Sequence, residues 1–451
     1  MIKRWVAIIA TVVSCAAIVG MSQASEFDPQ AATEMYLASI SDEAKAKSDA
    51  YFEGGYWLIL YSALVSIAAS LILLFTRASA AMRDLAEAMT SWRWLQTLVY
   101  GVLFVLITSV MTLPYSYYTD FVREHEFGLS NLSLEEWLNE YAIGLGVGSL
   151  MTGLFIVGLY AVIRRTGESW WIWATGVSII FAMFAAMIGP VFISPLFNEY
   201  KPMREGQLKE EILAMARANG VPADNVYEFN ASKQHKRISA NVSGFLGTTR
   251  ISLNDNLLNQ ATPEEVKAVM AHEIGHYALG HIYEMMVAVA VIAAIMFLLI
   301  DIGFGALYSM FGTWWGVRDF GDTAGLPILV VVSSLFGILL TPVQNSMVRT
   351  NEAEADIFGL NVAREPDGFA TVSLKLATYR KLDPTPWEEF VFYDHPSGRS
   401  RISMAMHWKA EHLEESRNET PVAIMAPSVS MEAPPTTEEG EPEPFDLKAH
   451  Q

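Results

Sequence analysis

The sequence predicts a mainly α-helical protein that crosses a membrane several times and carries a small extramembrane domain of mixed α and β structure. Of its 451 residues 52% are hydrophobic, and the mean hydropathy is positive. The apolar residues are gathered in long runs, which excludes an ordinary soluble enzyme. A polar stretch, residues 198–283, interrupts these runs and has the patterns of two helices and two short strands. This stretch predicts the extramembrane domain.

Residues 1–24 have the form of a secretory signal. Lys3 and Arg4 precede an apolar run, and the Ser-Gln-Ala sequence at residues 22–24 has the small-x-small pattern of a cleavage site. A cleaved signal peptide and a retained signal anchor both fit this pattern. The next segment, residues 25–55, is acidic and mildly amphipathic, and we expect it to lie outside the bilayer.

Six further segments are long and apolar enough to cross a bilayer. Tryptophan and tyrosine residues stand at several of their ends, as they do at membrane interfaces. The segments are residues 56–76, 95–113, 143–163, 170–193, 285–304 and 326–343. We therefore expect four transmembrane helices within residues 56–194 and two within 284–343. Together with the N-terminal segment, the total is about seven.

The first part of the extramembrane domain is expected at residues 195–283. A helix is predicted over residues 205–220, where apolar residues share one face and an Asn-Gly pair marks the end. Short strands are predicted over residues 225–229 and 248–253. They lead into a second helix, which carries the most informative motif of the chain.

That second helix contains the pattern His-Glu-x-x-His, which is typical of zinc metallopeptidases. Thr262 and Glu265 form a capping box at its start. His272 and His276 are four residues apart, so both imidazoles lie on one helix face and can bind one zinc ion. Glu273 lies beside them and can accept a proton from the attacking water and pass it to the leaving amine.

A third zinc ligand has to come from another part of the chain. In metzincins the third histidine would fall one position after His281, so we expect His281 to be structural or to support a ligand. Glu352 and Asp356 follow the last apolar segment and share a helix face. One can bind zinc while the other accepts a hydrogen bond from a ligand imidazole. Glu354 is expected to point away from both.

Residues 344–412 are expected to complete the metallopeptidase domain. His395 and Arg401 belong to a polar cluster near its end and can stabilise a developing oxyanion or anchor a substrate backbone. An ordinary surface loop is the alternative. Residues 413–451, which are rich in Pro, Glu and Thr, predict a disordered acidic tail.

The net charge limits the binding partners of the chain, and the cysteine content limits its metal ligands. The net charge of -19 disfavours nucleic acid as a partner. The single cysteine, Cys15, excludes an internal disulfide framework and leaves histidines and carboxylates as metal ligands.

With these motifs the chain resembles the type I CAAX prenyl proteases, a family of integral-membrane zinc metallopeptidases. The resemblance extends to about Trp408 and is carried by residues 272–276, 352–356 and 395–402. It implies about seven transmembrane helices around a hydrophilic chamber. It also implies one zinc ion per chain.

The resemblance assigns roles to individual residues. It implies that His272, His276 and Glu352 hold the zinc and that Glu273 is the base. It also implies that His395 and Arg401 face the substrate. The family's substrate-pairing strand would include Ala240, Asn241 and Val242. This stretch lacks the aromatic residues usual in that strand, so the subsite preference stays open.

We therefore expect a peptide or protein substrate that is membrane-associated or lipidated, with the lipid bilayer as the other partner. Nothing in the sequence shows a prenylated substrate, so a membrane quality-control protease is an equal expectation. A transporter would need charged or helix-breaking residues within the apolar segments, which are largely free of charges. An inactive scaffold is disfavoured because Glu273 is present.

The arginines predict the orientation of the protein in its membrane, which would be the inner membrane in a bacterium. Arg77, Arg83 and Arg93 follow the first of the six segments, and Arg164 and Arg165 follow the third. Loops rich in arginine stay in the cytoplasm. Alternating from these loops places both parts of the peptidase domain on the periplasmic or exterior side.

Overall fold

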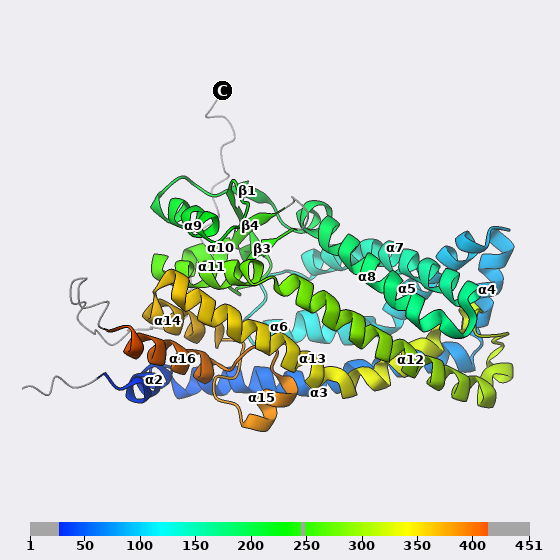
Figure 1. Ribbon diagram of the computed structural model, residues 1–451. Coiled ribbons are helices and arrows are strands. Elements are labelled where there is room, and N and C mark those ends of the chain that lie inside the picture. The colour runs from blue at the N-terminus through cyan, green and yellow to red at the C-terminus, as the bar shows by residue number, and fades with distance from the viewer. Residues whose placement is uncertain (1–26, 245–248, 414–451) are drawn as a thin grey trace, which may run out of the picture.

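The computed structural model describes residues 27–244 and 249–413 (Figure 1). Long helices run along an elongated molecule, with a small sheet near one end and the short helix α4 (Ala78–Met89) at the other. The predicted signal segment and nearly all of the predicted acidic tail lie outside the described residues.

Each of the six predicted spans lies mostly in a helix of its own, and the span at residues 170–193 ends in the short element that follows its helix. These helices are α3 (Asp42–Phe75), α5 (Arg93–Tyr117), α7 (Leu134–Thr166), α8 (Trp170–Ile188), α12 (His281–Trp315) and α13 (Leu326–Ala363). Where α7, α8 and the short turns after them are taken as one run, the described residues contain five helical runs long and apolar enough to cross a membrane. The expected total of about seven is therefore approximate.

Helices α12 and α13 are longer than is needed to cross a bilayer. At about 1.5 Å per residue, α12 and α13 are roughly 52 and 57 Å long, whereas a hydrocarbon core is about 30 Å thick. Both helices are therefore longer than the hydrocarbon core, and α13 continues well beyond its apolar part. The last turns of α13 reach the helix that carries the His-Glu-x-x-His motif.

The arginine-containing loops meet at the end of the molecule opposite the sheet. Arg77 Nε donates a hydrogen bond to the carbonyl of Trp314, and Arg164 Nε donates one to the carbonyl of Gly321. The loop between α12 and α13 thus joins the two loops that the sequence predicts to be cytoplasmic. All three lie on the same side of the helical bundle.

The sheet has four short strands in the order β1-β2-β4-β3. The strands are β1 (Tyr200–Pro202), β2 (Val226–Phe229), β3 (Ala240–Ser243) and β4 (Arg250–Asn254). β2 and β4 are parallel, and the other two pairs are antiparallel. The predictions of strands at residues 225–229 and 248–253 are confirmed within two residues at each end. β1 escaped the sequence analysis because three residues carry too little pattern.

Three helices belong to this part of the domain: α9 (Gln207–Ala218), α10 (Asp255–Gln260) and α11 (Pro263–Ala278). The predicted helix over residues 205–220 corresponds to α9. The predicted capping box at the start of α11 is confirmed. The Thr262 side chain accepts a hydrogen bond from the Glu265 N–H, and the Glu265 side chain accepts one from the Thr262 N–H.

Helices from both ends of the chain complete the domain. These are α14 (Pro366–Leu376), α15 (Pro386–Phe392), α16 (Gly398–Glu411) and, from the N-terminal region, α2 (Pro29–Ala38). Short turns connect the longer elements: α6 (Arg123–Glu126), η1 (Tyr118–Val122), η2 (Gly167–Ser169), η3 (Gly189–Ile193), η4 (Ser194–Leu196), η5 (Ala231–Lys233) and η6 (Thr323–Gly325).

The segment at residues 25–55 is more closely integrated than its acidic composition suggests. Ala32 of α2 is buried in a cluster with Phe369 of α14. The hydroxyl of Tyr36 donates a hydrogen bond to Asp367 at 2.7 Å. The rest of the segment continues directly into α3, which begins at Asp42. Hence the segment is part of the domain around the sheet and part of a long membrane helix.

Candidate active site

The candidate site lies where α11 crosses the end of α13, and glycines allow the close approach. A Cβ atom added to Gly359 would lie 3.0 Å from the backbone nitrogen of His272. One added to Gly275 would lie 3.0 Å from the ring of Phe358. At Gly359 the nearest atoms are backbone atoms, so a side chain there would have to push the two helices apart. The crossing brings the motif histidines of α11 against the acidic residues of α13.

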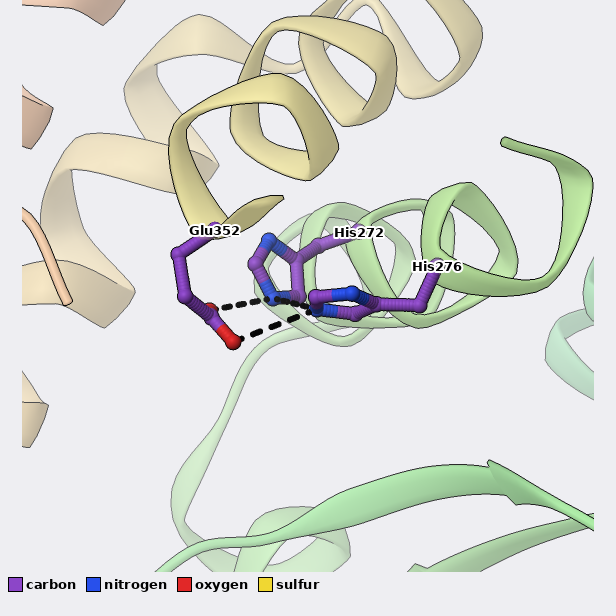
Figure 2. A group of neighbouring side chains, drawn as sticks. All are labelled: His272, His276 and Glu352. Carbon is purple, nitrogen blue, oxygen red and sulfur yellow. Dashed lines mark hydrogen bonds and ion pairs between the residues drawn. The ribbon is translucent and has the colours of Figure 1, made fainter. Parts of the chain in front are cut away.

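Three potential metal ligands converge at this crossing, as Figure 2 shows. The Nε2 atoms of His272 and His276 lie 3.3 and 3.4 Å from the carboxylate oxygens of Glu352. The two Nε2 atoms are 3.1 Å apart. One donor atom from each residue falls within 4.8 Å of the others.

This arrangement fits a metal ion. Two imidazole nitrogens and a carboxylate that face one another repel unless a proton or a cation lies between them. Glu352 Oε2 is also buried without a hydrogen bond. A set of two histidine nitrogens and one carboxylate oxygen is one that catalytic zinc sites use, with the fourth position left open.

The surroundings of His272 favour positive charge at the same place. Burial opposes the charged imidazole, but hydrogen bonds to Asp356 and Glu352 outweigh it and raise the pKa of His272 to about 9. Carboxylates that hold a proton so firmly on an imidazole also favour a metal cation in place of that proton.

Asp356 orients His272 from the side away from the proposed metal position. Its Oδ1 lies 2.8 Å from His272 Nδ1. Arg401 donates to both of its oxygens, through Nε at 2.9 Å and through Nη2 at 2.5 Å. Asp356 is completely buried. This carboxylate therefore holds the proton of His272 on Nδ1 and leaves Nε2 free to bind a metal.

A cavity of about 150 Å³ opens beside the ligands. Glu273, His395 and Arg401 line it, as does Ala240 of β3. Burial raises the pKa of the Glu273 carboxyl, although the nearby histidines oppose this. A raised pKa suits a carboxylate that has to accept a proton and give it up again near neutral pH.

His395 reaches the site from the loop after α15. Its Nε2 lies 3.1 Å from Glu352 Oε2, and its Nδ1 lies 2.8 Å from Asp394 Oδ1. Arg401 lies in the cavity wall, but its Nε and Nη2 are engaged by Asp356. The structure thus gives Arg401 a positioning contact that the sequence analysis did not foresee.

The edge of the sheet lies beside the cavity. β3 is the terminal strand and pairs on one side only, with β4. Ala240 of β3 lines the cavity, and Asn241 and Val242 follow it along the strand. An edge strand in this position can bind an extended peptide backbone.

Sequence reasoning missed several residues of the cavity wall, among them a tyrosine and an arginine. Tyr379 and Arg380 line the cavity from the connection between α14 and α15. They belong to no motif, and their place depends on how α14 packs against α11. No local pattern in the sequence signals this packing.

In a comparison with known proteins, each half of the chain matches a family model. Residues 202–409 match the model of peptidase family M48. Residues 28–199 match the model described as the CAAX prenyl protease N-terminal region, with five membrane helices.

Individual relatives agree with these matches. An uncharacterized metalloprotease of Bacillus subtilis, YhfN, is 27% identical over 336 residues, which cover 74% of this chain and 79% of that protein. CAAX prenyl protease 1 of Saccharomyces cerevisiae is 29% identical, over 68% of this chain and 71% of its own length. The crystal structure of S. mikatae Ste24p has a similar fold, with a TM-score of 0.69 and 24% identity over 81% of this chain and 89% of that one.

Proposed function

The chain belongs to the CAAX prenyl protease family of M48 metalloproteases and is an integral membrane protein, and from this we propose how its own residues cleave a peptide. His272, His276 and Glu352 hold one zinc ion. Glu273 is the general base, and His395 assists at the developing oxyanion. The convergence of two imidazole nitrogens and a buried carboxylate carries this proposal.

The mechanism follows from the position of each group. A zinc ion, when bound, polarises the scissile carbonyl and makes water a better nucleophile at neutral pH. Glu273 takes the proton of the attacking water and then delivers it to the nitrogen of the leaving amine. When both of its nitrogens carry protons, His395 donates from Nδ1 to Asp394 and can donate from Nε2 to the carbonyl oxygen as negative charge develops there. Asp356, held by Arg401, keeps His272 in the tautomer that binds metal.

The substrate is proposed to be a membrane-associated protein or peptide. Its backbone would extend β3 as an added strand along Ala240, Asn241 and Val242, beside Glu273. Several relatives are named CAAX prenyl proteases, which supports lipidated substrates. The Bacillus subtilis relative is named only a metalloprotease, so a quality-control role without prenylated substrates stays the second candidate.

We also propose that the site opens on the periplasmic or exterior side. The arginine-containing loops meet at the opposite end of the molecule from the ligands, and such loops stay in the cytoplasm.

The test of the chemistry is Glu273→Gln, with Glu264→Gln on an exposed turn of the same helix as the control. Cleavage of a fluorogenic peptide and zinc content are measured on the full chain in detergent. Glu273→Gln should lower turnover by about 10²- to 10⁴-fold, because it removes the base, and should keep one zinc per chain. Turnover close to that of the unaltered protein would refute the role of Glu273, and unaltered protein that binds no zinc would refute the ligand set.

A further inference from the structure

A third histidine lies behind the proposed ligand His276. The chain leaves α11 through Gly280, whose positive φ of 74° allows the sharp turn into α12. His281 begins α12 and folds back so that its Nδ1 lies 2.8 Å from His276 Nδ1. Its other nitrogen, Nε2, is buried without a hydrogen bond and lies 3.4 Å from Glu354 Oε2. His281 is only 3% exposed.

The row of contacts from His276 through His281 to Glu354 determines which ring nitrogen of each histidine carries the proton. His276 Nε2 faces Glu352 and His272, so in the metal-bound protein it carries no proton. A neutral His276 then carries its proton on Nδ1 and donates it to His281 Nδ1. His281, which accepts through Nδ1, must carry its own proton on Nε2. That proton points to the carboxylate of Glu354.

We propose that His281 and Glu354 are positioning residues for His276, as Asp356 is for His272. This inference rests on the proposed zinc site. Each ligand histidine is then connected to a carboxylate. His272 contacts Asp356 directly, and His276 reaches Glu354 through the imidazole of His281. Such partners fix the orientation of the ring and raise its basicity toward the metal.

Asp356 and Glu354 are expected to contribute differently to zinc affinity. Asp356 is fully buried and is held by Arg401, whereas the side chain of Glu354 is 55% exposed and its oxygen lies 3.4 Å from His281. Loss of Glu354 should therefore cost less than loss of Asp356. The sequence analysis expected Glu354 to point away from Glu352 and Asp356, and the structure shows that it faces His281.

The test compares variants of the full chain in detergent by their zinc dissociation constants, measured by competition with a chelator. His281→Leu removes the acceptor and should weaken zinc binding by about 10- to 100-fold. His281→Asn places an amide oxygen near the position of Nδ1 and should restore most of the affinity. Glu354→Ala should weaken binding by less than His281→Leu does. Glu284→Gln, an exposed neighbour on α12, is the control and should bind as the unaltered protein does.

A double variant makes the test specific. If Glu354 acts only through His281, adding Glu354→Ala to His281→Leu should cause no further loss. Additive losses, or unaltered zinc affinity in His281→Leu, would overturn the proposal. So would a His281→Asn protein that loses at least 10-fold in zinc affinity, or a Glu354→Ala protein with unaltered affinity. These variants remain informative if His281→Leu does not fold.

Two other outcomes are distinguishable. Unaltered protein that binds no zinc would refute the proposed function itself. A second, weaker zinc that is lost in both Glu354→Ala and Glu284→Gln, while the tight zinc is unaffected, would show that His281, Glu284 and Glu354 form a separate cation site, and it would overturn the positioning role. These three residues have donor atoms within 4.8 Å of one another.

Discussion

Glu352 contacts three imidazoles. His272, His276 and His395 each place Nε2 within 3.4 Å of one of its oxygens. Asp356, one turn further along α13, contacts one imidazole and the guanidinium of Arg401. Two carboxylates on one helix face therefore have different tasks. The first faces the metal position, and the second faces the far side of a ligand.

This difference predicts different phenotypes. Glu352→Ala should lose both zinc and activity, because it removes a ligand. Asp356→Asn keeps an oxygen that can accept from His272 but loses the charge that pairs with Arg401, and zinc binding should weaken by about 10- to 100-fold. Zinc content after dialysis and chelator competition measure the two effects. Retention of one tightly bound zinc in Glu352→Ala would contradict the ligand assignment.

The crossing of α11 and α13 depends on the absence of side chains. A Cβ at Gly359 would meet backbone atoms of His272 at 3.0 and 3.2 Å, and backbone cannot move aside as a flexible side chain can. In contrast, nothing lies within 4 Å of a Cβ at Gly337 of the same helix. The two glycines form a matched pair for substitution.

Gly359→Ala should push α11 away from α13 and separate His272 from Glu352. We expect peptide turnover to fall by roughly 100-fold, since a misplacement of about 1 Å costs that much. Gly337→Ala should leave turnover unchanged and stabilise the helix by up to about 1 kcal/mol, because alanine is the better helix former. Turnover and thermal unfolding of both variants decide the point. Equal activity in the two would show that the crossing tolerates a methyl group.

Features within single helices could be predicted from the sequence. The four-residue spacing of His272 and His276 placed them on one face, as did that of Glu352 and Asp356, and the structure shows both pairs so arranged. The contact of Arg401 with Asp356 could not be predicted in this way. It joins separate helices and depends on how α16 packs, which no local pattern encodes.

The docking of α2 on α14 is a second case of this kind. The acidic composition of residues 25–55 indicated solvent exposure, and the contact of Tyr36 with Asp367 arises only in the folded domain. Sequence patterns thus predicted the long helices, two of the strands and the residue pairs that share a helix face, and tertiary packing determined the contacts between these elements.

At the scale of the whole molecule, the two ends differ in the arginines of their loops, which influence how a protein is oriented in its membrane. The loops that contain Arg77 and Arg164 meet the α12–α13 loop at one end, and the proposed ligands lie at the other. Loops rich in arginine resist export. The ends should therefore lie on opposite sides of the membrane.

Single cysteines test this orientation after the one native cysteine, Cys15, is replaced by serine. Asp224→Cys reports on the sheet end and Glu168→Cys on the arginine end, and both positions are exposed. In spheroplasts, a membrane-impermeant maleimide should label position 224 directly and position 168 only after the membrane is permeabilised. Labelling in the reverse order would place the active site in the cytoplasm.

The proposed ligand set is divided by a membrane hairpin. His272 and His276 precede α12, whereas Glu352 follows the apolar part of α13. A ribosome therefore delivers the two histidines first, and the third ligand joins them only after α12 and α13 have both been inserted and the chain has returned to the same face. On this ligand set, the site is complete only once the hairpin is inserted. A chain that stalls before this hairpin is inserted therefore holds only two of the three proposed ligands.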